Sequence, residues 1–194
     1  MTKKFLIILT TALCLGFTTA KQNTEQVTVV KQDLQDSLRT ELAHEIHNYI
    51  KRNFPQSKLS GHVLATMCIK HQFDPVFALA QGQIESGFGT AGKAKHTNSV
   101  WNVGACDGWS TSRMKKAGFG FAHPNKSVEP YIVLVKTKYM GEKKTHKDLL
   151  RHYVSLSGHR YASSKTYEKK LTAQYNRIKS KTKILKVYNE IVKG

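Results

Sequence analysis

The stretch DPVFALAQGQIESGFG (residues 74–89) contains a complete helix with its start and stop signals. Asp74 is a preferred capping residue, and Pro75 follows at the first helical position, where proline is well tolerated. The side chains that recur at helical spacing on one face are Phe77, Ala80, Gln81 and Ile84. Gly87 or Gly89 ends the helix, because glycine readily adopts the left-handed backbone of a helix terminus. We therefore predict a helix over these residues with one buried face.

One carboxylate, Glu85, lies at the edge of this apolar face, one residue after Ile84. Partial burial raises the pKa of a carboxyl group, which a general acid needs near neutral pH. A purely solvated glutamate fits the position poorly, since negative charge at a helix C-terminus is disfavoured. The glycines that follow would leave room for a bulky substrate. These features make Glu85 the candidate catalytic acid.

A second candidate segment, NSVWNVG (residues 98–104), places two amides and an indole in a glycine-bounded loop. Asn98 and Asn102 have the donors and acceptors to hold sugar hydroxyl and acetamido groups. Trp101 offers an aromatic face on which a sugar ring can stack, although core packing explains a tryptophan equally well. The loop is consistent with a carbohydrate site.

The remaining pattern is mostly helical. Apolar residues at helical spacing predict helices from Asp33 to about residue 54, from a cap at Ser60 to about residue 72, from Ser127 to about residue 139, and over 149–153, 167–178 and 184–191. Residues 90–125 lack this period and predict loops with a small β-hairpin, its strands at 99–104 and 118–123. The fold class is mainly α, or α+β if the small hairpin is counted: a helical bundle with a loop-rich insert at about 90–125, in one domain over 33–194.

The first 20 residues have the layout of a secretory signal: two lysines, an apolar run over 5–17, and small residues ending at Ala20. A membrane anchor is the alternative, but 13 apolar residues fall short of the roughly 20 that span a bilayer. Residues 21–32 read as a flexible leader. We expect export to the periplasm, the cell envelope or the medium.

The chain is strongly basic, with a formal net charge of +18. Removal of residues 1–20 takes away two of 31 basic residues and no acidic ones, which leaves 29 − 13 = +16. Such a charge attracts polyanions. The polyanions in question are nucleic acid, anionic lipid and the acidic polymers of a cell wall, and export makes nucleic acid the least expected of the three. We expect an anionic cell-wall polymer as partner and the protein as a monomer. From Lys136 onward the chain has 16 basic residues and four acidic ones. This excess of positive charge indicates either a solvated helix surface or a surface that anchors the protein on an anionic polymer.

Cysteines and histidines give no cofactor signal. Cys68 falls on an apolar helical face and is typical of a buried thiol, so we expect no bridge to Cys106. His44 and His47 lie three residues apart, but no third ligand completes a metal site. We expect neither a metal nor another cofactor.

Three segments, in order, resemble the bacterial glucosaminidase family, glycoside hydrolase family 73. ALAQGQIESGFGTAGKAKHTNSVWNVGA (residues 78–105) resembles the family's A-x-A-Q-x-x-x-E-S-x-x-G helix end and the loop that follows it. SVEPY (127–131) resembles a Ser followed four residues later by Tyr, and GHRYASSKTYEKKLTAQYNRI (158–178) resembles its Y-A-[ST]-x-x-x-Y-x-x-K segment. Together they cover roughly residues 60–180.

The resemblance implies a lysozyme-like enzyme that cleaves the glycan strands of peptidoglycan, most simply an endo-β-N-acetylglucosaminidase. Glu85 would protonate the glycosidic oxygen, and Tyr161 would lie near the reacting sugar. The residues implied to bind substrate are Gln81, Ser86, Asn98, Trp101 and Asn102.

The identity of the second catalytic group stays open. Between Gly87 and Lys126 the only acidic residue is Asp107, which lies in a Cys-Asp-Gly turn signal; the next is Glu129, near a helix start. If neither faces Glu85, the acetamido group of the substrate could act as the nucleophile, or the 6-hydroxyl could close an anhydro ring, as in a lytic transglycosylase.

Three further functions fit the same sequence features. A muramidase would use the same fold and the same acid. A non-catalytic cationic module would only bind the cell wall, and a cationic protein could damage membranes by charge alone.

Overall fold

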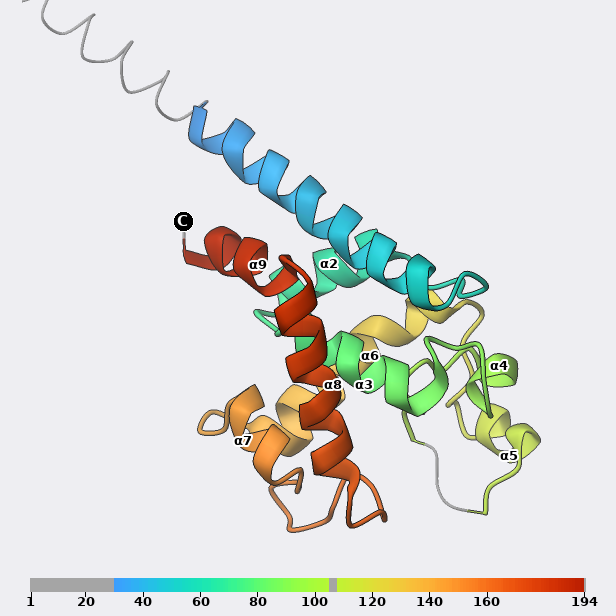
Figure 1. Cartoon of the computed structure of the whole chain (residues 1–194). Helices are drawn as coiled ribbons and strands as arrows, with labels where there is room; N and C mark the ends of the chain where they lie inside the picture. The colour runs from blue at the N-terminus through green and yellow to red at the C-terminus, as the bar shows by residue number, and fades with distance from the viewer. Residues whose placement is uncertain (1–29, 105–107, 194) are drawn as a thin grey trace, which may run out of the picture. The chain divides into compact units, whose positions relative to one another are not determined.

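A computed structural model describes residues 30–104 and 108–193 (Figure 1). The chain divides into two compact units, Met1–Ser37 and Leu38–Gly194. In the first unit the described residues, 30–37, are helical, so helix is present three residues before the predicted start at Asp33. The predicted export signal and residues 21–29 of the leader lie outside the described residues.

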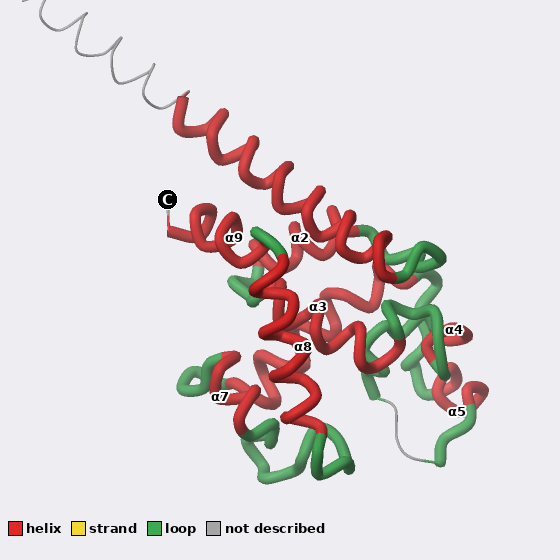
Figure 2. The backbone as a smooth tube through the Cα atoms, in the orientation of Figure 1, coloured by secondary structure: helices red, strands yellow, loops and turns green. Residues whose placement is uncertain are grey.

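The second unit begins with helix over residues 38–53 and continues through short helices and turns. The labelled elements are α2 (Gly61–Lys70), α3 (Pro75–Ser86), α4 (Ala94–Thr97), α5 (Thr111–Lys116), the 3₁₀ helix η1 (Pro124–Ser127), α6 (Val128–Leu134), the π-helix η2 (Val135–Met140), α7 (His146–Arg151), α8 (Tyr167–Lys181) and α9 (Ile184–Lys193). Figure 2 draws the described chain as helix and loop throughout. The mainly α fold is confirmed, and it is consistent with the lysozyme-like architecture that the resemblance implies.

The expected hairpin is wrong for the residues that the structure describes in the 90–125 region. Turns occupy 100–101 and 103–104, and no strand forms over 99–104 or 118–123. Asn98 and Asn102 have φ angles of 55° and 50°, in the left-handed region, and Gly104 has 70°. A chain that turns left-handed at three positions within seven residues cannot extend into a strand.

Helix α3 lies at the centre of the second unit, where α8 crosses it (Figure 1). Its predicted start is confirmed, because the Asp74 carboxylate accepts hydrogen bonds from the backbone N–H groups of Val76 and Phe77 at 2.7 and 3.1 Å. Gly87 ends it with a φ of 55°. Every residue from Pro75 to Gly82 is buried, so the first two turns of α3 are enclosed on all sides, in contrast to the single buried face predicted. A helix surrounded in this way holds the side chains of its last turn in fixed positions.

Burial also affects His146, the first residue of α7. Its ring lies edge-on to Phe73, with ring centroids 4.4 Å apart, and 5.1 Å from Phe77. Removal from water lowers the pKa of His146 to about 4; the charge of Asp74 opposes this, and that of Lys136 adds to it. The Nε2 atom has no hydrogen-bond partner among the described residues. The folded state therefore keeps this imidazole neutral.

We predict that His146 makes the fold acid-sensitive. Its folded-state pKa is depressed, so the unfolded chain binds the proton first, and stability falls as the pH drops from about 6.5 toward 4, by at most about 3 kcal/mol. Urea unfolding at a series of pH values measures this. His146→Leu should flatten the decline over that window, and equal slopes for the two proteins would contradict the assignment.

Candidate active site

A pocket of about 830 Å³ opens beside the C-terminal end of α3. Its volume lies in the range of small-molecule sites. It is lined by Glu85, Lys93, Trp101, Asn102, Val103, Gly104, Trp109, Phe119, Leu134, Lys138, Tyr139, Arg160, Tyr161, Ala162 and Ser163. Glu85 is the only carboxylate among these described residues, and three of them are cations. We refer to this cavity as the Glu85 pocket.

Glu85 occupies the last turn of α3 and is partly buried. Its Oε1 accepts a hydrogen bond from the Tyr167 hydroxyl at 2.5 Å, and its Oε2 accepts one from Asn102 Nδ2 at 3.2 Å. Burial raises the pKa of Glu85, and these two hydrogen bonds offset only part of the rise. A carboxyl group with a raised pKa, at the wall of a pocket, is suited to donate a proton near neutral pH.

The loop at 98–104 holds its residues by contacts with the core. The Trp101 indole is fully buried; it donates to the backbone oxygen of Ala78 at 2.9 Å and stacks on Tyr131, with centroids 4.4 Å apart. Asn98 donates to the backbone oxygen of Phe121 at 2.8 Å and lies outside the pocket lining. Asn102 does line the pocket, and its Oδ1 has no partner within the described chain.

Tyr161 forms part of the pocket wall. Its hydroxyl donates to the backbone oxygen of Trp101 at 3.0 Å, and its ring stacks between those of Tyr153 and Tyr167 at 4.5 and 5.7 Å. The ring therefore shares the pocket wall with Glu85, while the hydroxyl proton is already engaged by the protein. A role in shaping the pocket fits this arrangement better than proton transfer.

Two residues expected to bind substrate are instead enclosed by protein. Gln81 is 0% exposed, and its side chain bonds to tyrosine hydroxyls. Ser86 is 4% exposed; its hydroxyl donates to the Val100 oxygen at 2.6 Å and accepts from the Gly89 N–H at 2.8 Å. Neither lines the pocket, because both lie on faces of α3 that the core covers. We assign them structural roles in place of the expected contacts with substrate.

The candidate second carboxylates are not brought to Glu85 within the described residues. Glu129, in the first turn of α6, bonds to Lys70 at 2.7 Å and to His71 at 2.9 Å, and these contacts lower its pKa. It joins α6 to the end of α2 and is absent from the pocket lining, which corrects the expectation of a catalytic role. Asp107 lies outside the described residues, as does Cys106, whose pairing with the buried Cys68 therefore stays untested.

The glycine after the acid also has a different role from the one expected. A Cβ on Gly87 would lie 2.5 Å from the ring of Phe54, which fills the space beside it. Gly87 thus permits close packing and a left-handed helix end, and it does not clear a path for substrate. The aromatic wall of the pocket comes from farther along the chain.

Three functional side chains had no clear signal in the sequence. Tyr167 matches the second tyrosine of the Y-A-[ST]-x-x-x-Y-x-x-K segment, but its position on the apolar face of α8 predicts a core residue, and it is not among the expected site residues. Trp109 reads as a loop residue, yet it lines the pocket, with the Arg113 guanidinium 4.3 Å from its ring centroid and Phe119 at 6.3 Å. Tyr139 lines the pocket because the π-helix η2 continues α6, and such segments are frequent at functional sites.

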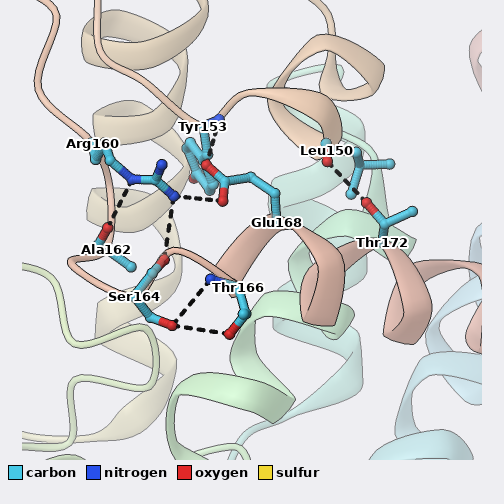
Figure 3. A network of polar contacts seen from close by, with 8 residues as sticks. All are labelled: Leu150, Tyr153, Arg160, Ala162, Ser164, Thr166, Glu168 and Thr172. Atoms are coloured by element: carbon cyan, nitrogen blue, oxygen red, sulfur yellow. Dashed lines mark hydrogen bonds and ion pairs between the residues drawn. The ribbon is translucent and has the colours of Figure 1, made fainter.

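A polar network fixes the segment that joins Tyr161 to α8 (Figure 3). Glu168 lies at the centre of this network. The Glu168 carboxylate accepts a hydrogen bond from the Arg160 guanidinium at 2.6 Å and one from the backbone N–H of Tyr153 at 3.2 Å. Arg160 also donates to the backbone oxygens of Ala162 and Ser164, each at 3.3 Å. Because Glu168 directly follows Tyr167, this network sets where the Tyr167 ring enters the site.

No group of three or more possible metal ligands occurs among the described residues. Within the same part of the chain, no helix has the length and apolar character needed to cross a membrane.

A partly buried carboxylic acid at the wall of a pocket lined by aromatic rings and an amide is the type of site that glycoside hydrolases use. The family model of the glucosaminidases, described as mannosyl-glycoprotein endo-beta-N-acetylglucosaminidase, matches residues 62–180. The chain belongs to this family. Searches of curated proteins and of solved structures each found no match.

We predict that Glu168→Ala lowers both stability and activity. It removes hydrogen bonds to Arg160 and to the Tyr153 N–H, which should cost about 1–2 kcal/mol and loosen the start of α8. Thermal unfolding and cell-wall clearing assays measure the two effects. Glu190→Ala is the matched control, since Glu190 pairs with Lys186 only at the exposed surface, at 4.0 Å. Equal behaviour of the two variants would contradict the role of the network.

Proposed function

We propose that the protein is an endo-β-N-acetylglucosaminidase that cleaves the glycan strand of peptidoglycan, with Glu85 as the general acid. Membership of the glucosaminidase family supports a hydrolase of the peptidoglycan type. The observation that carries the residue assignment is the position of Glu85, partly buried at the wall of an aromatic pocket, with a raised pKa.

The chemistry follows from what surrounds the carboxyl group. Protonated Glu85 donates its proton to the glycosidic oxygen as the bond to the sugar breaks. The carboxylate that remains is stabilised by the hydrogen bonds from Tyr167 and Asn102. Charge develops on the sugar ring in the transition state, and a group opposite Glu85 must compensate it.

We propose that the group opposite Glu85 is the acetamido oxygen of the substrate itself. Two observations favour it. Glu85 is the only carboxylate among the described residues that line the pocket, and the buried Oδ1 of Asn102 has no described partner. An unpaired acceptor of this kind is suited to hold a substrate N–H. The acetamido oxygen would attack the anomeric carbon, and water would then open the ring that forms.

The released fragments distinguish the candidate activities. A glucosaminidase leaves a reducing-end N-acetylglucosamine, a muramidase leaves a reducing-end muramic acid, and a lytic transglycosylase leaves an anhydro sugar. Mass spectrometry of the products, with and without borohydride reduction, separates the three. An anhydro product would overturn the hydrolytic assignment and leave the role of Glu85 as acid in place.

We further propose that the exported protein is held on an anionic cell-wall polymer by its C-terminal helices. Helix α8 carries five basic residues and one acidic residue. Its basic residues are all exposed: Lys169, Lys170, Arg177, Lys179 and Lys181. Side chains such as these bind polyanions by long-range attraction, without a shaped site.

We predict that Glu85→Gln lowers the rate of glycan cleavage at least about 100-fold, because the amide has no acidic proton to donate. Digestion of purified peptidoglycan, followed by mass spectrometry, measures the loss. Glu129→Gln is the matched control and should keep wild-type activity, since Glu129 lies outside the pocket. Clearing that survives Glu85→Gln would favour a binding module or a membrane-damaging protein.

We predict a separate effect for the basic surface. Replacing Lys169, Lys170, Lys179 and Lys181 by Gln should weaken binding to an anionic wall polymer severalfold at low salt, and leave cleavage of short soluble glycans unchanged. Sedimentation with purified walls over a range of salt concentrations measures binding. The corresponding Lys→Arg variant keeps the charge and should bind normally. Loss of binding in the arginine variant would point to specific lysine contacts instead.

A further inference from the structure

We propose that Gln81 and Tyr167 form a directed hydrogen-bond relay that assigns the catalytic proton to Oε2 of Glu85. Both are positioning residues, since neither reaches the pocket. The inference rests on the proposed role of Glu85 as the general acid, and it adds which carboxyl oxygen acts and what fixes that choice.

The relay begins at a fully buried amide. Gln81 is 0% exposed, and its Oε1 accepts hydrogen bonds from the hydroxyls of Tyr131 and Tyr153 at 2.7 and 3.1 Å. Two O–H donors on one oxygen fix which way the amide faces. The Nε2 group is thereby directed at the Tyr167 hydroxyl, 3.1 Å away.

The second step follows from the hydrogen-bonding capacity of a phenol. A tyrosine hydroxyl has one hydrogen to donate. The Tyr167 oxygen receives an N–H from Gln81, so its own hydrogen is free to be donated to Oε1 of Glu85 at 2.5 Å. The relay therefore runs in one direction, from the buried amide through the phenol to the carboxyl group.

The third step locates the acid proton. A donor faces each carboxyl oxygen, but the bond from Tyr167 to Oε1 is 2.5 Å long and the bond from Asn102 to Oε2 is 3.2 Å long. A proton on Oε1 would oppose the shorter and stronger of the two bonds, whereas a proton on Oε2 opposes only the longer one. The proton of the neutral acid is therefore carried by Oε2. Oε2 contacts Asn102, which lines the pocket, so it is the oxygen on the substrate side. After the proton leaves, the same bond from Tyr167 stabilises the carboxylate.

The other groups near Glu85 do not supply this control. Tyr153 and Tyr161 face it from the loops beside α8, and burial raises the pKa of both well above the usual value, so they stay neutral. The cations that line the pocket, Lys93, Lys138 and Arg160, are present in every variant considered below and give a constant background.

The test is the pH profile of kcat for Tyr167→Phe. The phenylalanine keeps the ring and removes the donor that stabilises the carboxylate, so the pKa of Glu85 should rise. The alkaline limb of the profile should move up by about one pH unit. We expect kcat at the optimum to fall about tenfold, because the acid proton is no longer confined to Oε2. Gln81→Met, which leaves Tyr167 free to rotate, should shift the limb in the same direction by a smaller amount.

The chain supplies matched controls on the same two helices. Tyr175, also on α8, donates to the carboxylate of Asp74 at 2.8 Å. Gln83, also on α3, accepts from the Tyr49 hydroxyl at 2.6 Å and from Gln174 at 2.7 Å. Tyr175→Phe and Gln83→Met lose comparable hydrogen bonds and should lower the melting temperature, yet leave the pH profile of kcat in place.

A second measurement does not depend on turnover. Carbon-13 NMR titration of the Glu85 carboxyl, assigned by its absence in Glu85→Gln, reports the pKa of Glu85 directly. Tyr167→Phe should raise that pKa, and Tyr175→Phe should not. An unchanged Glu85 titration in Tyr167→Phe would overturn the relay, even if Glu85→Gln is inactive. A raised titration in Tyr167→Phe together with an active Glu85→Gln would support the relay and overturn the proposed function.

Discussion

The hydrogen bond from Tyr167 to Glu85 joins two helices whose contacting residues are 82 positions apart in sequence, and the site depends on it. It exists because α8 crosses α3 at the turn that carries the acid. Burial alone would raise the pKa of Glu85 without any control over which oxygen holds the proton. The hydrogen bond from α8 partly offsets the rise in the pKa of Glu85 and makes the two carboxyl oxygens inequivalent. The same bond links the stability of the helix crossing to the chemistry of the pocket.

Around this crossing the fold arranges polar groups in layers. The innermost layer is the Gln81 amide with the hydroxyls of Tyr131, Tyr153 and Tyr167, each of which is hydrogen-bonded to it, and Tyr167 donates in turn to Glu85. A buried polar network of this kind is rigid because every broken bond leaves an unpaired group in the core. The outer layer is the Arg160–Glu168 network, which holds the connection into α8. No member of the inner layer lines the pocket, whereas Arg160 of the outer layer does.

Much of the fold was predictable because its signals are local. The Asp74 cap, the Gly87 terminus and the Ser60 cap each act within a few residues, and the structure confirms them. The expected hairpin failed because glycine and asparagine are typical both of hairpin turns and of the left-handed turns found here. The Ser127 side chain joins the backbone of Pro124 and Val100 instead of capping α6, a contact across 27 residues that no local pattern predicts.

The sequence by itself determined a helix with a carboxylate at its last turn, an amide and aromatic loop after it, and the family of the domain. These follow from spacing and from short motifs, which depend only on neighbouring residues. Only the tertiary structure decided what each polar residue does. Gln81 and Ser86 face the core, and Glu129 pairs with α2. Tyr167, whose helical spacing predicts a core position, contacts the acid. The physical reason is that a polar side chain near a site can be satisfied by substrate or by protein, and the helix crossing selects which.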